Sequence, residues 1–190
     1  MRNVALTCTA IMLLGSTGGA LAEEMGEFRC AKPGTVLEFS NGNKSRIVGQ
    51  VGLDCSYRSE VSGRAWTDHA FFIQVTPVGE GVTPEIIVEM EKLWPLRAGK
   101  SVDFWRKSGG YEYHDTYTVK PIETMQVTAG SFPAWRIDLE RVQIPSNNTI
   151  RHTYWWAPSI PASVKYEARP IRGNWLGVAP DYQLVAVRAP

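Results

Sequence analysis

The stretch from Ile150 to Glu167 constrains the fold of this chain more than any other part of the sequence. The run Tyr-Trp-Trp at 154–156 predicts a strand, because aromatic residues favour extended structure, and Pro158 ends it. Apolar and polar residues then alternate over 163–169, which predicts a second strand. The pattern indicates a β-hairpin with one apolar face and one solvated face.

Short β-favouring runs separated by turn residues recur along the rest of the chain. We count about nine strands, with glycine, proline or asparagine signals every 8 to 15 residues. Residues 59–68 are polar and are expected to form a loop, and residues 70–76 are expected to form a strand. Apolar residues change parity within 135–144, which predicts either a β-bulge or strong coiling of the strand near Glu140 and Arg141.

A single helix is expected near residues 84–93. Thr83 is suited to cap it, Pro84 fits the first helical position, and Pro95 ends it. The apolar residues between them fall on one stripe, so we expect this helix to pack on a sheet. The predicted fold is therefore mainly β: a curled antiparallel meander, either a half-barrel or an open barrel, with one packed helix.

The first 22 residues have the features of a cleavable signal peptide, with a short apolar run and Ala-Leu-Ala before the expected cleavage after Ala22. We therefore expect an exported, periplasmic protein with no transmembrane segment after signal removal. Residues 23–190 suit one domain. Loss of Arg2 leaves as many basic as acidic residues, 19 of each, which disfavours a nucleic-acid partner.

Two cysteines remain in the mature chain, Cys30 and Cys55. In an exported protein such a pair most simply forms a disulfide, and two free thiols are the alternative. The disulfide would hold an N-terminal hairpin unit, residues 28–58, which we expect to pack on a main sheet formed by residues 69–190.

Three turn-and-strand motifs carry a resemblance to a known class of proteins. They are Leu-Trp-Pro-Leu-Arg-Ala-Gly-Lys at 93–100, Val-Thr-Ala-Gly-Ser-Phe at 127–132, and Thr-Tyr-Trp-Trp-Ala-Pro at 153–158 with Val-Lys-Tyr-Glu at 164–167. Over residues 93–190 the chain resembles uncharacterised proteobacterial periplasmic or envelope β-proteins, whose half-barrel sheets are distantly like those of lipoprotein carriers. The resemblance implies a fold and a periplasmic setting and carries no catalytic signature.

Aromatic residues give the main functional prediction. We expect a concave face of the curled sheet to form an apolar, ligand-binding groove lined by Trp135, Tyr154, Trp156 and Tyr166. Plain core packing of these rings is the alternative. Trp155 points to the opposite face, where it could meet another protein.

Asp115 shares parity with the tyrosines at 111, 113 and 117. If that face is the core, this buried carboxylate needs a basic partner, for which Arg136, Arg141 and Arg151 are the candidates. If the strand frays or bulges there, Asp115 is solvated instead.

No motif in the sequence predicts a catalytic, metal or cofactor site. His69, His114 and His152 are far apart, and none has a ligand partner at metal-site spacing. We therefore expect a non-enzymatic protein that binds an acyl chain, a lipoprotein or an envelope partner. The alternatives are a structural or assembly factor of the cell envelope that acts by protein–protein contact, and a hydrolase whose residues meet only in space.

Overall fold

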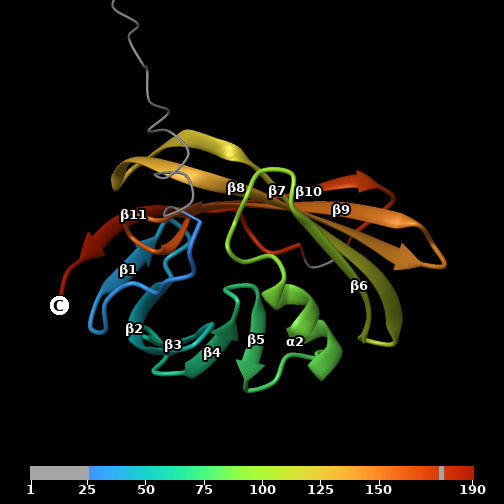
Figure 1. The fold of residues 1–190 in the computed structure, drawn as a ribbon, viewed down its shortest axis with the longest axis horizontal. Helices are drawn as coiled ribbons and strands as arrows, with labels where there is room; N and C mark the ends of the chain where they lie inside the picture. The colour runs from blue at the N-terminus through green and yellow to red at the C-terminus, as the bar shows by residue number, and fades with distance from the viewer. Residues whose placement is uncertain (1–25, 176–177) are drawn as a thin grey trace, which may run out of the picture.

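The computed structural model describes residues 26–175 and 178–190. The predicted signal peptide, residues 1–22, lies outside the described residues. Eleven antiparallel strands form one open sheet in the order β5-β4-β3-β2-β1-β11-β10-β9-β8-β7-β6. The sheet is curled and does not close into a barrel, as the sequence predicted (Figure 1).

Five strands precede the helix and six follow it. The first five are β1 (Val36–Phe39), β2 (Lys44–Val51), β3 (Asp54–Ser59), β4 (Ala65–His69) and β5 (Ile73–Thr76). The others are β6 (Ser101–Ser108), β7 (Tyr111–Val127), β8 (Gly130–Ile144), β9 (Asn148–Ala157), β10 (Ala162–Arg172) and β11 (Tyr182–Arg188). The hairpin predicted around Ile150–Glu167 is β9 and β10.

The helix α2 (Pro84–Glu91) lies between β5 and β6, on the opposite side of the core from the long strands (Figure 1). The Thr83 hydroxyl accepts a hydrogen bond from the amide of Ile86, and Pro84 occupies the first turn. On the apolar stripe of the helix, Ile86 and Met90 are buried. Leu93 and Trp94, just after the helix, belong to the same buried core cluster. The helix therefore fills part of the concave side of the sheet.

The last strand joins the two halves of the sheet. β11 pairs with β10 on one side and with β1 on the other, so the first and the last strand lie side by side. Tyr182, Leu184 and Val187 lie on β11. Because β11 sits in the middle of the strand order, the sheet is one continuous surface rather than two.

Cys30 and Cys55 form a disulfide, as predicted. Cys55 is fully buried and lies in a second core cluster with Leu37, Ile47 and Tyr57. The cross-link fastens the segment before β1 to β3. Within the described residues, no helix is both long and apolar enough to cross a membrane.

Three local predictions were wrong. The polar segment 59–68 is not a loop, because β4 occupies its second half and pairs with β3 through a turn at Gly63, which has positive φ. The run 70–76 is not one strand, because Ala70 and Phe71 both have positive φ and form a turn before β5. The bulge lies between Val119 and Ile122 on β7, where the pairing with β8 shifts register, and not at 140–141.

Candidate functional site

A row of aromatic rings crosses the concave face of the sheet. Strand pairing places Tyr154 opposite Tyr166 and Tyr166 opposite Tyr182, so their side chains share one face of β9, β10 and β11. Neighbouring ring centroids along the row lie 5.0 to 5.9 Å apart. We call this row the aromatic ladder; it consists of Phe104, Tyr117, Phe72, Tyr154, Tyr166, Tyr182 and Phe39.

The four residues predicted to line a groove all lie on this concave face, in two pairs. Tyr154 and Tyr166 belong to the aromatic ladder. Trp135 and Trp156 are paired on β8 and β9 and are buried under the segment that follows α2, where the ring of Trp94 contacts Trp156 at 5.1 Å. The helix segment therefore covers one end of the predicted groove, and the tyrosines lie beyond its cover.

The turn between β4 and β5 reaches into the concave face. The ring of Phe72 lies 5.4 Å from Tyr117 and 5.3 Å from Tyr154, so this residue of the turn completes the ladder. Ala70 (φ 48°) and Phe71 (φ 72°) hold left-handed backbone conformations that side chains other than glycine rarely adopt. Such conformations persist only where surrounding contacts enforce them, and they are frequent at ligand clamps.

Two cavities flank this turn. A cavity of about 140 Å³ lies between the ladder and β3–β4, and its wall includes Phe71, Tyr154 and Tyr182. A second cavity of about 250 Å³ lies between the loop before α2 and β6–β8, and its wall includes Phe72 and Tyr117. The Phe71–Phe72 turn therefore separates two spaces on one aromatic surface.

The phenol groups on the concave face stay neutral. Burial raises the pKa of Tyr166 and of Tyr182 to about 12, and it raises the pKa of Tyr117 and Tyr154 further. The rings thus offer apolar faces with polar but uncharged tips, which suits an apolar ligand with a polar end group.

One carboxyl side chain, that of Asp68, lines the smaller cavity among the described residues. Burial raises the pKa of the Asp68 carboxyl to about 6, and a hydrogen bond from the indole N–H of Trp66 (3.1 Å) partly opposes the shift. The charge of the Asp68 carboxyl on this wall therefore changes near pH 6, as its raised pKa requires.

Asp115 is buried, with 1% of its surface exposed, and it does not lack partners. The Arg141 guanidinium donates two hydrogen bonds to the carboxylate, at 2.7 and 2.8 Å, and Arg106 Nε lies 3.1 Å from Oδ2. The ring of Tyr113 lies against both guanidinium groups, at 5.5 and 5.7 Å. We call these four residues the Asp115 cluster. Its three charged members, Arg106, Asp115 and Arg141, form part of the wall of the larger cavity.

The three histidines lie in three separate places. His69 Nδ1 is 2.6 Å from Asp54 and its Nε2 is 3.3 Å from Glu91, so it links β3 to α2. His114 contacts Asp103 on the surface, and His152 Nδ1 lies 2.7 Å from the hydroxyl of Tyr166.

These contacts bring no serine or threonine hydroxyl to a histidine–carboxylate pair within the described residues. In that part of the chain, no group of three or more His, Cys, Asp or Glu side chains could hold a metal ion.

Burial beside Arg141 lowers the pKa of His152 to about 4. The other ring nitrogen, Nε2, is buried and has no hydrogen-bond partner in the described structure. His152 is therefore a neutral part of the concave wall at neutral pH.

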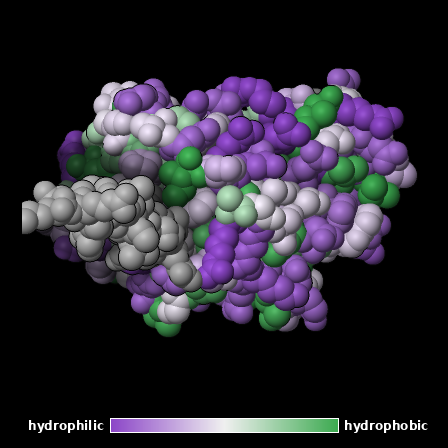
Figure 2. All heavy atoms as spheres, turned by 45° about the horizontal axis from the view of Figure 1, so that its top comes forward, coloured by the Kyte–Doolittle hydropathy of each residue, from purple (hydrophilic) through white to green (hydrophobic). Residues whose placement is uncertain are grey.

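Trp155 does not form an exposed patch on the convex face. It is 7% exposed, its indole N–H donates to the carboxylate of Glu123, and Lys165 lies over its ring at 4.8 Å. Figure 2 shows the molecule with the top of Figure 1 turned forward. The surface in this view is mainly hydrophilic, and its hydrophobic groups form separate small patches.

Sequence reasoning missed three residues of the concave face. Arg106 shares the parity of Val102 and Phe104 on β6, and this basic residue in an apolar series was a usable signal for the partner of Asp115. Phe71 and Phe72 had no such signal, because nothing in the sequence indicates a left-handed turn at Ala-Phe.

Comparisons with known proteins give only remote likenesses. No protein-family model matches the chain, and no curated protein matches it significantly. Among solved structures, a candidate exported protein of Bacteroides fragilis with a YmcC-like fold shares 12% identity at a TM-score of 0.43, over 86% of this chain and 99% of that one.

The hypothetical lipoprotein YmcC of Escherichia coli shares 12% identity at a TM-score of 0.45, over 82% of this chain and 84% of that one. A candidate lipoprotein of Parabacteroides distasonis shares 13% identity at a TM-score of 0.40, over 84% and 100%. These neighbours are described as exported proteins or lipoproteins, and they are not confined to the proteobacteria.

Proposed function

We propose that the chain is an exported, non-enzymatic protein of the bacterial periplasm that binds an apolar ligand, an acyl chain or the lipid part of a lipoprotein, on its concave face. The observation that carries this proposal is the 140 Å³ cavity between the aromatic ladder and β3–β4. An apolar cavity of about 150 Å³ in another protein takes up benzene, so this space suits part of a hydrocarbon chain.

Movement of the β4–β5 turn would provide the room for a longer chain. The rings of Phe71 and Phe72 stand between the 140 Å³ and 250 Å³ cavities. The left-handed conformations of Ala70 and Phe71 make this turn less stable than an ordinary one, because each costs roughly 1–3 kcal/mol. A ligand that displaced the turn would release that strain and join the two spaces.

Binding of an acyl probe tests the proposal. The mature protein is titrated with 11-(dansylamino)undecanoic acid, whose fluorescence rises in an apolar site, and native mass spectrometry examines protein purified from the periplasm without delipidation. We expect saturable probe binding and a co-purifying acyl species. Absence of both would overturn the proposal.

Two variants locate the probe. Ala162→Leu adds volume to the wall of the 140 Å³ cavity and is expected to weaken probe binding about tenfold or more. Ala65→Leu makes the same change at an exposed position of β4 and is expected to leave binding unchanged. Equal effects of the two substitutions would place the probe elsewhere.

A further inference from the structure

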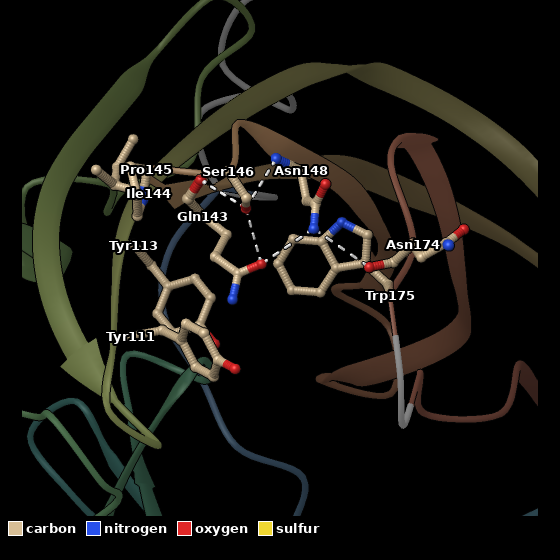
Figure 3. Close-up of a pocket in the computed structure, with 9 residues that line it drawn as sticks. All are labelled: Tyr111, Tyr113, Gln143, Ile144, Pro145, Ser146, Asn148, Asn174 and Trp175. Carbon is tan, nitrogen blue, oxygen red and sulfur yellow. Dashed lines mark hydrogen bonds between the residues drawn. The ribbon is translucent and has the colours of Figure 1, made fainter.

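A cleft of about 560 Å³ lies where β7, the β8–β9 turn and the segment that contains Trp175 meet (Figure 3). Among the described residues, no charged side chain lines it. The amides of Gln143 and Asn148 and the hydroxyls of Tyr111 and Tyr113 offer both donors and acceptors, so this cleft favours no single class of ligand. The cavity of about 140 Å³ beside the aromatic ladder is more selective, because it combines aromatic rings with one carboxylate.

Aromatic rings surround the 140 Å³ cavity on several sides. The rings of Tyr57 and Trp66, on β3 and β4, stack at 5.2 Å with an angle of 15° between their planes. The rings of Phe39 and Tyr182, on β1 and β11, lie 5.0 Å apart in an edge-on arrangement. We call the full set of rings that line the cavity the aromatic cage; it consists of Phe39, Tyr57, Trp66, Phe71, Tyr154 and Tyr182.

Asp68 places one carboxylate in the wall of this cavity. It lies on the same face of β4 as Trp66, whose indole N–H donates to Oδ2 at 3.1 Å. Burial, and to a lesser extent the charge of Asp68, raises the pKa of Tyr57, and the same charge acts on Tyr182, so both phenol groups lie near this carboxylate. Among the described residues, no basic side chain lines the cavity.

The carboxylate of Asp68 therefore faces neutral groups. The other titratable side chains that line the cavity are the phenols of Tyr57, Tyr154 and Tyr182, which burial keeps uncharged. Placing a carboxylate in such surroundings is costly, and the pKa of Asp68 is raised to about 6 for this reason. A bound cation would interact with the carboxylate in a poorly solvated space, where the attraction is stronger than in water.

The size and the chemistry of the cavity select a methylated ammonium group. Organic cations are attracted to the faces of aromatic rings, and cages of such rings recognise quaternary ammonium groups. A cavity of about 150 Å³ in another protein holds benzene, and a trimethylammonium group with its first methylene has one heavy atom fewer. A primary ammonium is strongly hydrated and has three N–H groups to satisfy, whereas a quaternary one needs no hydrogen-bond acceptor.

We propose that the aromatic cage and Asp68 bind a quaternary ammonium group, which is the polar end of the ligand whose hydrocarbon part lies along the aromatic ladder. This assignment rests on the proposed function, because it names the end group of the same ligand. Phe39, Trp66 and Phe71 are partly exposed, so a ligand can reach the cage from solvent. A chain attached to the ammonium group would pass the Phe71–Phe72 turn toward the 250 Å³ cavity.

Titration of the mature protein at pH 7.5 with choline and with 3,3-dimethylbutan-1-ol tests the proposal. The two molecules have the same shape, and the second has a carbon atom in place of the charged nitrogen. We expect choline to bind saturably and to move the indole N–H signal of Trp66 in nuclear magnetic resonance spectra. The neutral alcohol is expected to bind at least tenfold more weakly.

Three variants separate the charge from the rings. Asp68→Asn keeps an acceptor for Trp66 and removes the charge, so it should weaken choline binding at least tenfold and leave binding of the alcohol unchanged. Asp103→Asn, the control, removes an exposed carboxylate on β6 and should change neither. Phe39→Leu removes one ring and should weaken choline binding about threefold without weakening binding of the alcohol.

The pH dependence of choline binding gives a readout that needs no variant. At pH 5 about one Asp68 carboxyl in ten is ionised, because its pKa is raised to about 6. Choline should therefore bind about tenfold more weakly at pH 5 than at pH 7.5, and Asp68→Asn should abolish this difference.

The proposal is overturned if 3,3-dimethylbutan-1-ol binds as tightly as choline, or if Asp68→Asn leaves the affinity for choline unchanged. Saturable binding of the dansyl acyl probe alongside either result would leave the proposed function standing. Absence of probe binding and of a co-purifying acyl species, with choline still bound, would overturn the proposed function and not the cage.

Discussion

At the scale of single residues, Asp115 is the most deeply buried charged side chain in the described part of the chain. One carboxylate, 1% exposed, lies against Arg106 and Arg141. A buried charge left without its partner is costly because the interior solvates it poorly. Removing this carboxylate would leave two guanidinium groups facing each other beside Tyr113.

Asp115→Asn is therefore expected to lower the free energy of unfolding by about 3–5 kcal/mol. Asp103→Asn is the matched control, because its carboxylate contacts His114 on the surface and is 62% exposed, so a change below about 1 kcal/mol is expected. Urea unfolding followed by tryptophan fluorescence measures both. Similar losses of unfolding free energy in the two variants would show that burying the ion pair adds nothing to its effect on stability.

Two buried groups act on stability in opposite directions as the pH falls. The pKa of Asp68 is raised from 3.8 to about 6, so the folded state binds this proton more tightly, and acidification from pH 6 to 4 favours folding. The pKa of His152 is lowered from 6.5 to about 4, so its contribution to stability is complete above pH 6.5 and is lost as the pH falls toward 4.

Asp68→Asn isolates the first of these effects. The amide keeps an acceptor for the Trp66 indole and removes the buried charge, so the variant should be more stable than the natural protein at pH 7.5, by roughly 2 kcal/mol. The difference should shrink through pH 6 and vanish near pH 4. Unfolding measured at half-unit steps of pH checks this, and a difference independent of pH would contradict it.

At the scale of elements, the β4–β5 turn is the least ordinary part of the fold. Ala70 is fully buried, its carbonyl accepts a hydrogen bond from the indole of Trp94, and its amide donates to Leu53. These contacts hold Ala70 and Phe71 in left-handed conformations. The conformation of the turn is therefore stabilised by contacts with the surrounding structure and not by the local preferences of its own residues.

Glycine substitution measures this dependence. Ala70→Gly loses a buried methyl group and some chain rigidity but relieves the left-handed strain, so stability should stay within about 0.5 kcal/mol. Ala134→Gly makes the same change at another fully buried alanine, in the regular strand β8, and should cost about 1.5 kcal/mol. Equal costs at the two positions, by chemical denaturation, would argue against strain in the turn.

The elements that sequence predicts well are those with strong local signals. The β9–β10 hairpin, the helix at Pro84 and the Cys30–Cys55 disulfide follow from alternation, capping and cysteine count. The shared face of Tyr154 and Trp156 follows from the period of a strand. The sequence does not reveal the turn at Ala70, because tertiary contacts impose it, or the cleft at Trp175, because its walls come from segments far apart in the chain.

At the scale of the whole molecule, β11 determines how the sheet is held together. It pairs with β1 through Leu37 and Val187 and with β10 through Tyr166 and Tyr182. The disulfide supports the half that contains β1–β5. Stability of this half therefore rests on a covalent link at one place and on pairing with the last strand at another.

Replacing both cysteines by serine tests the covalent link. The two residues are 25 apart in sequence, so loss of the cross-link should lower the free energy of unfolding by about 3 kcal/mol. Hydrogen exchange should show the loss concentrated in β1–β5. A uniform loss across the sheet would mean that the two halves unfold only together.

The position of β11 also governs when the protein can fold. Before β11 is in place, β1 and β10 each have an unpaired edge, so the two halves of the sheet cannot join until that strand is available. The unpaired edges of β1 and β10 would also accept β11 of a neighbouring molecule. Refolding at high protein concentration should therefore favour dimers that have exchanged this strand.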